Sequence, residues 1–356
     1  MKNIFGMTLE ELQEEFSAAR LEKYRAKQVA SWLYQKHAKS FAAMTNLPKS
    51  LRAALSEKYC IDVPALRTRL DAADGRTSKF LLAFADDAAV EAVLMRQPYG
   101  NSICISTQAG CNMGCAFCAS TLHGLARDLT AGEMLAEVLF IEEMLEKEDE
   151  KVDTMVLMGS GEPLMNYANV VRFLRLLHED YVLNMSYRSI AISTSGIVPA
   201  IDRLAEEGMP VTLSISLHAP RDDLRSELMP INRRYPLADV VAAGRRYAEK
   251  TGRRVTYEYI LIRDVNDGER EARELVELLR GQLASVNLIP INPVAERGFE
   301  RPEEERTAAF CRFLERRRIT ATIRREMGSD IQAACGQLRN RHMNGSKTVR
   351  NGTIRL

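Results

Sequence analysis

The sequence contains no apolar stretch long enough to cross a membrane. Its 356 residues are 46% hydrophobic and 27% charged, and no run approaches the roughly 20 apolar residues that a membrane helix needs. The N-terminal segment resembles an amphipathic helix, and it lacks the basic and then apolar parts of a secretory signal. We therefore expect a cytoplasmic protein without a membrane partner, in a compartment that keeps thiols reduced.

The chain also lacks an excess of charge of either sign. It has 49 Lys and Arg against 48 Asp and Glu, which gives a net charge of +1. A globally basic nucleic-acid-binding protein is thereby excluded, so any RNA binding must use local positive potential. Local basic runs lie at 316–318, at 324–325 and in the tail after Leu338. A solvated face is the simpler interpretation of any one of these runs.

Internal repeats, low-complexity blocks and long linkers are absent from the sequence as well. A chain of this length can form one large α/β domain with a smaller domain beside it. We expect helices up to about residue 60, the first of them opened by a capping box at Thr8 and Glu11. Extended segments with a turn at Asp74 and Gly75 should follow, up to about residue 95.

Cysteine is distributed unevenly along the chain. Four of the seven cysteines lie in CISTQAGCNMGCAFC (104–118), where Cys111, Cys115 and Cys118 have the spacing C-x3-C-x2-C. Such a short loop can direct three thiolate sulfurs at one soft metal site. Structural zinc sites and ordinary four-iron clusters take four protein ligands, so three cysteines would leave one iron of a cluster open. A zinc site with a distant fourth ligand is the alternative.

The cysteine spacing, with Phe117 before the last cysteine, resembles the signature of the radical S-adenosylmethionine (SAM) superfamily. The resemblance implies a [4Fe-4S] cluster held by Cys111, Cys115 and Cys118. In that superfamily the open iron binds the amino and carboxylate groups of SAM, and reduction cleaves SAM to a 5′-deoxyadenosyl radical. Cys60 and Cys311 lie in apolar, helix-like contexts and are expected in the core.

From residue 102 onward, strand-like and helix-length segments alternate. A capping box at Thr130 and Glu133 opens one helix, and a helix near 302–317 precedes a strand at 319–324. Such alternation predicts parallel β/α units around a sheet that is buried on both faces. We predict an α/β fold with a partial barrel of six units, a small helical N-terminal domain and a C-terminal extension. The six candidate barrel strands are 102–107, 154–158, 189–194, 211–217, 254–262 and 285–291.

Small and polar residues follow several of these strands. Ligands bind at the carboxyl ends of the strands in parallel α/β folds. A glycine there lets the backbone approach a ligand, and a carboxylate can accept hydrogen bonds from an ammonium group such as that of SAM. A lone histidine is more often structural. The candidate SAM-binding residues are Gly161, Glu162, Ser193, Ser216, Leu217, His218 and Asn292.

Longer strings resemble one family over nearly the whole chain. GNSICISTQAGCNMGCAFCAST, STSGIVPAI, SISLHAP, LMPINRRYPL, VNLIPINP and TIRREMGSDIQAACGQL are similar to the RNA methyltransferase family of RlmN and its relative Cfr. Ser160 departs from the family's usual Met, and Gln332 stands where an acidic residue is frequent. The domains that we expect are an RNA-contacting helical domain (1–66), a β-rich extension (67–100), a radical SAM partial barrel (101–294) and a C-terminal extension with Cys335 (295–356).

The resemblance implies methylation of C2 of an adenosine in 23S ribosomal RNA, and often of an adenosine in transfer RNA. That carbon is electron-poor and cannot attack the methyl group of SAM, which explains the radical cluster. By resemblance, Cys335 accepts a methyl group from one SAM, since a thiolate is a suitable nucleophile. A radical formed from a second SAM removes a hydrogen from S-methylcysteine, and the resulting carbon radical adds to C2. Cys104 would release the RNA–protein adduct by forming a transient disulfide with Cys335, and Glu91 would accept a proton.

The resemblance also implies a flavodoxin or a ferredoxin as the electron donor. Two other functions stay open. A Cfr-like enzyme with the same cysteines would methylate C8 of the same ribosomal adenosine, although GEPLMN and LIPINP look more like the C2 enzyme. A non-enzymatic RNA-binding protein with a structural metal site would bind zinc and would not cleave SAM.

Overall fold

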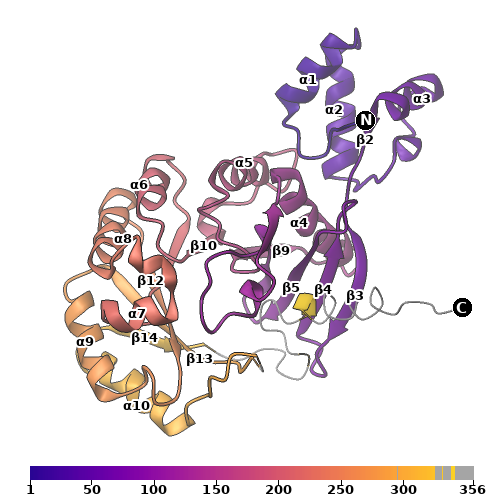
Figure 1. Cartoon of the computed structure of the whole chain (residues 1–356). Coiled ribbons are helices and arrows are strands. Elements are labelled where there is room, and N and C mark those ends of the chain that lie inside the picture. Colours follow the sequence, from indigo (N-terminus) through magenta and orange to yellow (C-terminus); the bar gives the residue numbers. More distant parts are fainter. Residues whose placement is uncertain (295, 325–330, 332–337, 341–356) are drawn as a thin grey trace, which may run out of the picture.

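The computed structural model of the chain describes residues 1–294, 296–324, 331 and 338–340. Within these residues ten strands form one curved sheet, in the order β14-β13-β12-β11-β10-β9-β6-β5-β4-β3 (Figure 1). The sheet is built from β3 (Ala65–Asp71), β4 (Thr77–Ala83), β5 (Ala89–Gln97), β6 (Gly100–Cys104), β9 (Val152–Leu157), β10 (Ile190–Thr194), β11 (Thr212–Ser216), β12 (Val255–Leu261), β13 (Ala284–Pro290) and β14 (Thr320–Ile323).

The sheet has a parallel and an antiparallel part that meet at β6. From β6 through β9 to β14 every neighbouring pair is parallel, and β3, β4 and β5 continue the sheet from β6 as antiparallel strands. The predicted partial barrel of an α/β fold is thereby confirmed, and β14 extends it at the far edge. The predicted boundaries of the four domains stay predictions.

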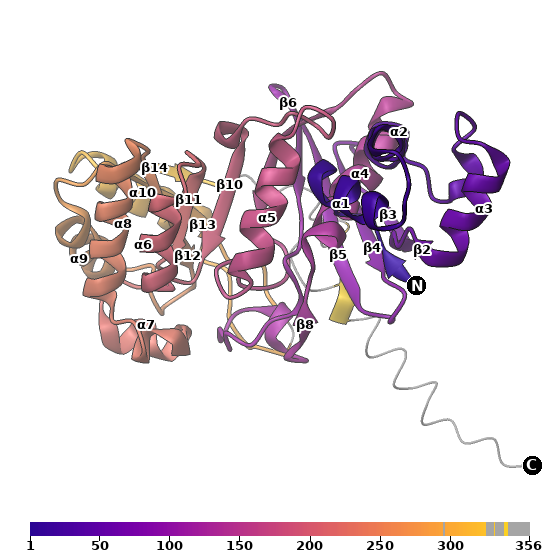
Figure 2. The same ribbon diagram turned by 90° about the horizontal axis from the view of Figure 1, so that it is seen from above.

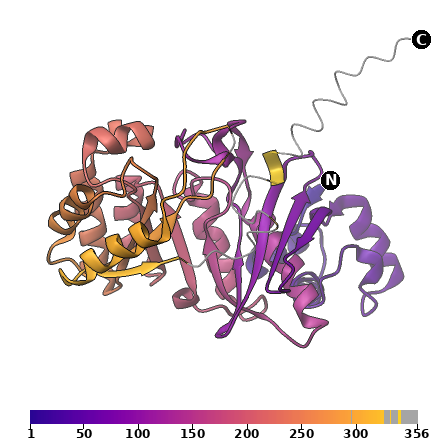
Figure 3. The same cartoon turned by 90° about the horizontal axis from the view of Figure 1, so that it is seen from below.

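Helices cover the sheet and bury apolar residues against it. In the view of Figure 2, α5, α6 and α8 lie beside one another over one face of the sheet, and Figure 3 shows the yellow-orange α10 along the β14 edge. Within the described part of the chain, no helix has the length and apolarity to cross a membrane. These helices are α4 (Ala131–Glu146), α5 (Tyr167–His178), α6 (Val198–Glu206), α7 (Asp222–Leu228), α8 (Leu237–Thr251), α9 (Glu269–Leu279) and α10 (Glu304–Glu315).

The N-terminal helices gather at one end of the sheet (Figure 1). They are α1 (Leu9–Ala18), α2 (Lys23–Tyr34) and α3 (Lys49–Lys58), with the short parallel pair β1 (Lys2–Asn3) and β2 (Tyr59–Cys60). The backbone between β1 and α1 packs tightly on α4, because a Cβ atom added to Gly6 would lie 2.3 Å from the Cα of Gly132. Arg172 of α5 donates to the carbonyl of Gly6 at 2.9 Å and pairs with Glu11. Residues 1–60 are therefore packed against and hydrogen-bonded to the barrel helices α4 and α5.

Most local signals read from the sequence were accurate, but Cys60, which was expected in the core, is partly exposed in the short strand β2. Both predicted capping boxes are present, at Thr8 with Glu11 and at Thr130 with Glu133. Each predicted strand corresponds to a strand in the structure, displaced at its ends by up to three residues. The turn expected at Asp74 and Gly75 joins β3 to β4.

Candidate active site

A short hairpin frames the cysteine loop. The strands β7 (Gln108–Gly110) and β8 (Leu125–Asp128) pair antiparallel and enclose the residues that carry Cys111, Cys115 and Cys118. The amide of Cys111 donates to the carbonyl of Gly124 at 3.2 Å, and the amide of Cys118 donates to that of Cys115 at 3.2 Å. The loop is thus a compact turn held at its base.

The three thiols lie near one another, and two of them are buried. Cys111 and Cys115 are only 7% and 9% exposed, and each thiol lies within electrostatic range of the other and of Cys118. Burial, and then the neighbouring thiols, raise the pKa of Cys111 to about 11 and raise that of Cys115 above its usual value. A bound metal would supply the positive charge that buried thiolates need. The donor set fits a sulfur-ligated cluster.

The same region is less suited to a single ion. Among the described residues, no three His, Cys, Asp or Glu side chains are gathered closely enough to bind one metal ion. A cube of four irons is larger than one ion, so its cysteine ligands can stand farther apart. The assignment of Cys111, Cys115 and Cys118 as ligands stays a prediction from their spacing and burial.

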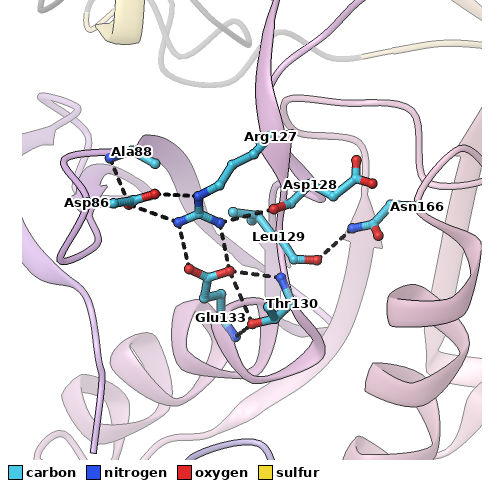
Figure 4. A network of polar contacts seen from close by, with 8 residues as sticks. All are labelled: Asp86, Ala88, Arg127, Asp128, Leu129, Thr130, Glu133 and Asn166. Atoms are coloured by element: carbon cyan, nitrogen blue, oxygen red, sulfur yellow. Dashed lines mark hydrogen bonds and ion pairs between the residues drawn. The ribbon is translucent and has the colours of Figure 1, made fainter. Parts of the chain in front are cut away.

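Arg127 of β8 anchors the hairpin to the antiparallel part of the sheet (Figure 4). Its guanidinium donates to both carboxylate oxygens of Asp86, in the loop between β4 and β5, at 2.5 and 2.9 Å. It also donates to both oxygens of Glu133 in the first turn of α4, at 2.7 and 2.9 Å. The side chain of Asn166 donates to the carbonyls of Thr107 and Leu129 on either side of the hairpin. These contacts fix where the cysteine loop stands.

Gly161 and Glu162 follow β9 and lie against the hairpin. Gly161 has φ of +109°, and an added Cβ would lie 2.6 Å from the Cβ of Gln108, so both backbone shape and space require glycine. The buried carboxylate of Glu162 accepts from the hydroxyl of Thr194 at 2.7 Å and from the amide of Ser195 at 2.6 Å. Burial raises the pKa of Glu162 above its usual value, and these donors oppose that rise. The group lies within electrostatic range of Cys111 and Cys115.

The other candidate SAM-binding residues lie along the carboxyl edge of the parallel strands. Ser193 is on β10, Ser216 ends β11, Leu217 and His218 follow directly, and Asn292 comes after β13. Because neighbouring parallel strands end at the same edge, these residues stand on one side of the barrel with Gly161 and Glu162. The fold therefore brings the candidate SAM-binding residues to one edge of the sheet, whereas the sequence showed only that each follows a predicted strand.

His218, at this edge of the sheet, has a defined protonation state. The backbone amide of Ile260 donates to its Nδ1 at 3.0 Å, so this nitrogen is unprotonated and Nε2 carries the proton. Burial, and then the nearby charge of Arg225, lower the pKa of His218 to about 3. The ring also meets Phe117 edge to face, with centroids 4.9 Å apart. His218 is a neutral imidazole beside the cysteine loop.

Arg225 is a buried residue of this edge that the sequence analysis missed. Its guanidinium donates to the carbonyls of Ser195 (2.7 Å), Ser216 (3.1 Å) and Leu217 (3.2 Å), and to the side chain of Asn232 (2.7 Å). Burial lowers its pKa to about 10. The string RDDLRSEL gives no sign of this role, since an arginine in such a polar helix is usually at the surface.

Cys104 and Glu91 share one face of the antiparallel part of the sheet. Opposed residues of antiparallel strands point to the same face, and so do residues two apart on one strand. Val93 lies opposite both Cys104 on β6 and Lys79 on β4, and Glu91 is two positions before Val93. Glu91, Cys104 and Lys79 therefore stand together on one side of β4, β5 and β6. Lys79 was missed because its place in KFLLAFA suggested a strand and no more.

Cys335 lies outside the described residues, but the chain three positions later is described. Leu338 packs against Leu81 and Ala89 on the same face as Glu91. The backbone amide of Arg339 donates to Oε1 of Glu91 at 2.6 Å. The C-terminal segment thus returns to β4 and β5, next to the strand that carries Cys104.

Comparison with known proteins first defines the class. Residues 105–276, which include the cysteine loop and most of the parallel strands, match the Radical SAM superfamily. Residues 2–61 match the ribosomal RNA large subunit methyltransferase N-terminal domain. The predicted superfamily is therefore confirmed, and it implies a [4Fe-4S] cluster and SAM.

The family follows from full-length relatives. A protein of Symbiobacterium thermophilum, named a probable dual-specificity RNA methyltransferase RlmN, is 54% identical over 94% of this chain and 91% of its own. A protein of Clostridium perfringens with the same name is 48% identical over 95% of this chain and 97% of its own. A radical SAM methyltransferase structure from Sphaerobacter thermophilus has a TM-score of 0.92 and 46% identity, and the match covers 95% of this chain and 99% of that one. The chain belongs to the RlmN family of radical SAM RNA methyltransferases.

Proposed function

We propose that this enzyme methylates C2 of an adenosine in 23S ribosomal RNA at the peptidyl-transferase centre, and an adenosine in transfer RNA as well. The dual-specificity name of the relatives supports both substrates. Ribosomal and transfer RNA are cytoplasmic, and so, we propose, is the enzyme.

In this proposal Cys111, Cys115 and Cys118 hold the [4Fe-4S] cluster, and SAM lies along the carboxyl edge of β9 to β13. When bound, the cluster and SAM supply the electron and the radical that removes a hydrogen from a methyl group. Glu162 has a buried carboxylate suited to the amino group of SAM. The remaining proposed SAM contacts are Gly161, Ser193, Ser216, Leu217, His218 and Asn292. A flavodoxin or a ferredoxin is the proposed electron donor.

Three residues of the chain itself would perform the transfer. Cys335 becomes S-methylcysteine and then binds RNA through that carbon. Glu91 accepts the proton from C2, and Cys104 attacks the sulfur of Cys335 to release the product, leaving a disulfide that the donor must reduce. The observation that carries this proposal is the common sheet face of Glu91 and Cys104, on which Leu338 packs. Leu338 is three positions after Cys335, and its packing on this face supports the proposal.

Nucleoside analysis of the product tests the proposal. The reconstituted enzyme is incubated without oxygen with SAM, a reductant and either 23S ribosomal RNA fragments or transfer RNA, and the digested RNA is analysed by mass spectrometry. We expect 2-methyladenosine from both RNAs, together with 5′-deoxyadenosine from SAM. Formation of 8-methyladenosine would identify the Cfr-like activity instead. Zinc in place of iron, without cleavage of SAM, would indicate a non-enzymatic metal-containing protein.

A further inference from the structure

A buried ion pair lies next to the proposed reaction centre. The ammonium group of Lys79 on β4 is 2.9 Å from Oε2 of Glu91 on β5, and the two side chains are 0% and 4% exposed. Lys79 is the one buried lysine in the described part of the chain. Burying a lysine is costly unless it is paired, so this position has a specific requirement for positive charge.

The two oxygens of Glu91 bind different parts of the molecule. Oε2 faces Lys79, whereas Oε1 accepts the backbone amide of Arg339 at 2.6 Å. The guanidinium of Arg339 also donates to the carbonyl of Ala89 at 3.0 Å, and Arg339 is itself buried. The carboxylate therefore joins the antiparallel strands to the segment that follows Cys335.

We propose that Lys79 is a positioning residue for the proton-transfer step. A proton acceptor must present a carboxylate oxygen in a fixed position relative to the proton that it removes. Lys79 binds Oε2 of Glu91 at 2.9 Å, and it thereby holds the carboxylate so that Oε1 faces the segment that follows Cys335. This inference rests on the proposed role of Glu91 as the proton acceptor.

The proton-transfer step involves no change of oxidation state. In the adduct between RNA and Cys335, the C2–H bond breaks and its electron pair stays on the adduct. The proton passes to a carboxylate oxygen of Glu91, which becomes a neutral acid beside the ammonium group of Lys79. The adduct would also give up its one unpaired electron, for which the oxidised iron–sulfur centre of the proposed function is the acceptor. In a separate step Cys104 attacks the sulfur of Cys335, the sulfur–carbon bond breaks, and the departing carbon takes up a proton to become the methyl group. Lys79 therefore affects the proton-transfer step and not the earlier methylation of Cys335 or the cleavage of SAM.

The test is a comparison of partial reactions in the full-length, cluster-loaded enzyme. Lys79→Met removes the charge while keeping much of the side-chain length. We expect unchanged S-methylcysteine at Cys335 and unchanged 5′-deoxyadenosine, measured by mass spectrometry. Formation of methylated RNA should fall on the order of 100-fold, the range of a lost proton acceptor. A covalent RNA–protein adduct should accumulate on denaturing gels, as it should in Glu91→Gln.

Two further variants are controls: a double variant tests for loss of stability, and a variant of another cation tests for a general effect of losing charge. Lys79→Met leaves Glu91 buried and unpaired, whereas Lys79→Met/Glu91→Gln removes both charges and should recover the thermal stability. The double variant should trap the adduct to the same extent as Glu91→Gln alone, since the two residues act in one step. Arg69→Met on the adjacent strand β3 removes a partly exposed cation that pairs with Asp71, and it should leave adduct release unchanged.

The outcomes separate this inference from the proposed function. If Glu91→Gln traps the adduct and Lys79→Met does not, the role of Lys79 is wrong and the proposed function stands. If Glu91→Gln releases product at the normal rate, the proton-acceptor role itself is wrong. If folded Lys79→Met loses SAM cleavage and Cys335 methylation to the same degree as product, or if the double variant falls below Glu91→Gln, Lys79 is a structural residue only.

Discussion

At the scale of single residues, the four cysteines of 104–118 divide into two groups. Cys111, Cys115 and Cys118 stand on the hairpin loop, near the carboxylate of Glu162. Cys104 ends β6 and is buried on the face that carries Glu91. Their closeness in the sequence therefore conceals two different surroundings, which is consistent with one group holding a cluster and the other acting on Cys335.

Two cysteine variants should stop the reaction at different stages. In Cys335→Ala no methyl acceptor remains, so methylated RNA should be absent. In Cys104→Ala the adduct should form and persist, because nothing attacks the sulfur of Cys335. Denaturing gels and nucleoside mass spectrometry distinguish the two. Cys60→Ala, at a partly exposed cysteine in β2, is the control and should behave as the unaltered enzyme. RNA methylation at the normal rate by Cys335→Ala would contradict the methylated-cysteine mechanism.

At the scale of elements, Arg127 anchors the short hairpin of β7 and β8 through ion pairs. Arg127 joins it to Asp86 and Glu133, from two elements that are far apart in the sequence. The hydrogen bond with Arg127 is the main cause that lowers the pKa of Asp86 from 3.8 to about 2, and burial opposes it. The folded-state pKa is therefore below the unfolded value. Asp86 thus stabilises the protein fully above pH 3.8 and loses this effect as the pH falls to about 2.

The pH dependence of Asp86→Asn should reveal this stabilisation. We expect the unaltered protein to exceed Asp86→Asn in free energy of unfolding above about pH 4, by less than about 1 kcal/mol because the pair is partly solvated. The side chain of Asp86 is in fact 50% exposed. Denaturant titrations at several pH values should show the difference vanish towards pH 2. The control is Asp87→Asn, whose side chain is 86% exposed. A difference that does not change with pH would contradict the assignment.

At the scale of the whole molecule, the N-terminal helices are held to the barrel by close backbone contact. Gly6 and Gly132 approach so closely that a Cβ atom on Gly132 would lie 2.6 Å from the carbonyl oxygen of Phe5. Arg172 adds a hydrogen bond to the carbonyl of Gly6. The chain is almost neutral, so RNA recognition depends on where its domains place their local charges. In the proposed function, the docking of residues 1–60 is one such determinant.

Gly132→Ala should weaken this docking. Alanine favours a helix over glycine by about 1 kcal/mol, yet the clash with Phe5 should lower the free energy of unfolding by about 1–3 kcal/mol. RNA methylation should fall, while methylation of Cys335 in the absence of RNA is retained. Thermal unfolding and mass spectrometry measure the two effects. The control is Ser50→Ala at an exposed position of α3. An unchanged unfolding temperature together with unchanged RNA methylation would argue against a role for this contact.

The sequence by itself determined those features that depend only on residues close to one another along the chain. The spacing of Cys111, Cys115 and Cys118 indicated the cluster, because a short loop limits where its own sulfurs can point. The capping boxes at Thr8 and Thr130 marked helix starts, since each is complete within four residues. The alternation of strands and helices was enough to predict the parallel barrel.

Only the tertiary structure decided which distant residues meet. Lys79, Glu91 and Cys104 share a face because of the register of β4, β5 and β6, and a shift by one residue would separate them. The contact of Arg339 with Glu91 joins positions 248 residues apart, and Arg225 binds carbonyls at the ends of two strands. No local pattern encodes such contacts, because they arise from packing of the whole chain. The sequence thus indicated the chemistry of the loop, and the fold placed Lys79, Glu91 and Cys104 on one face.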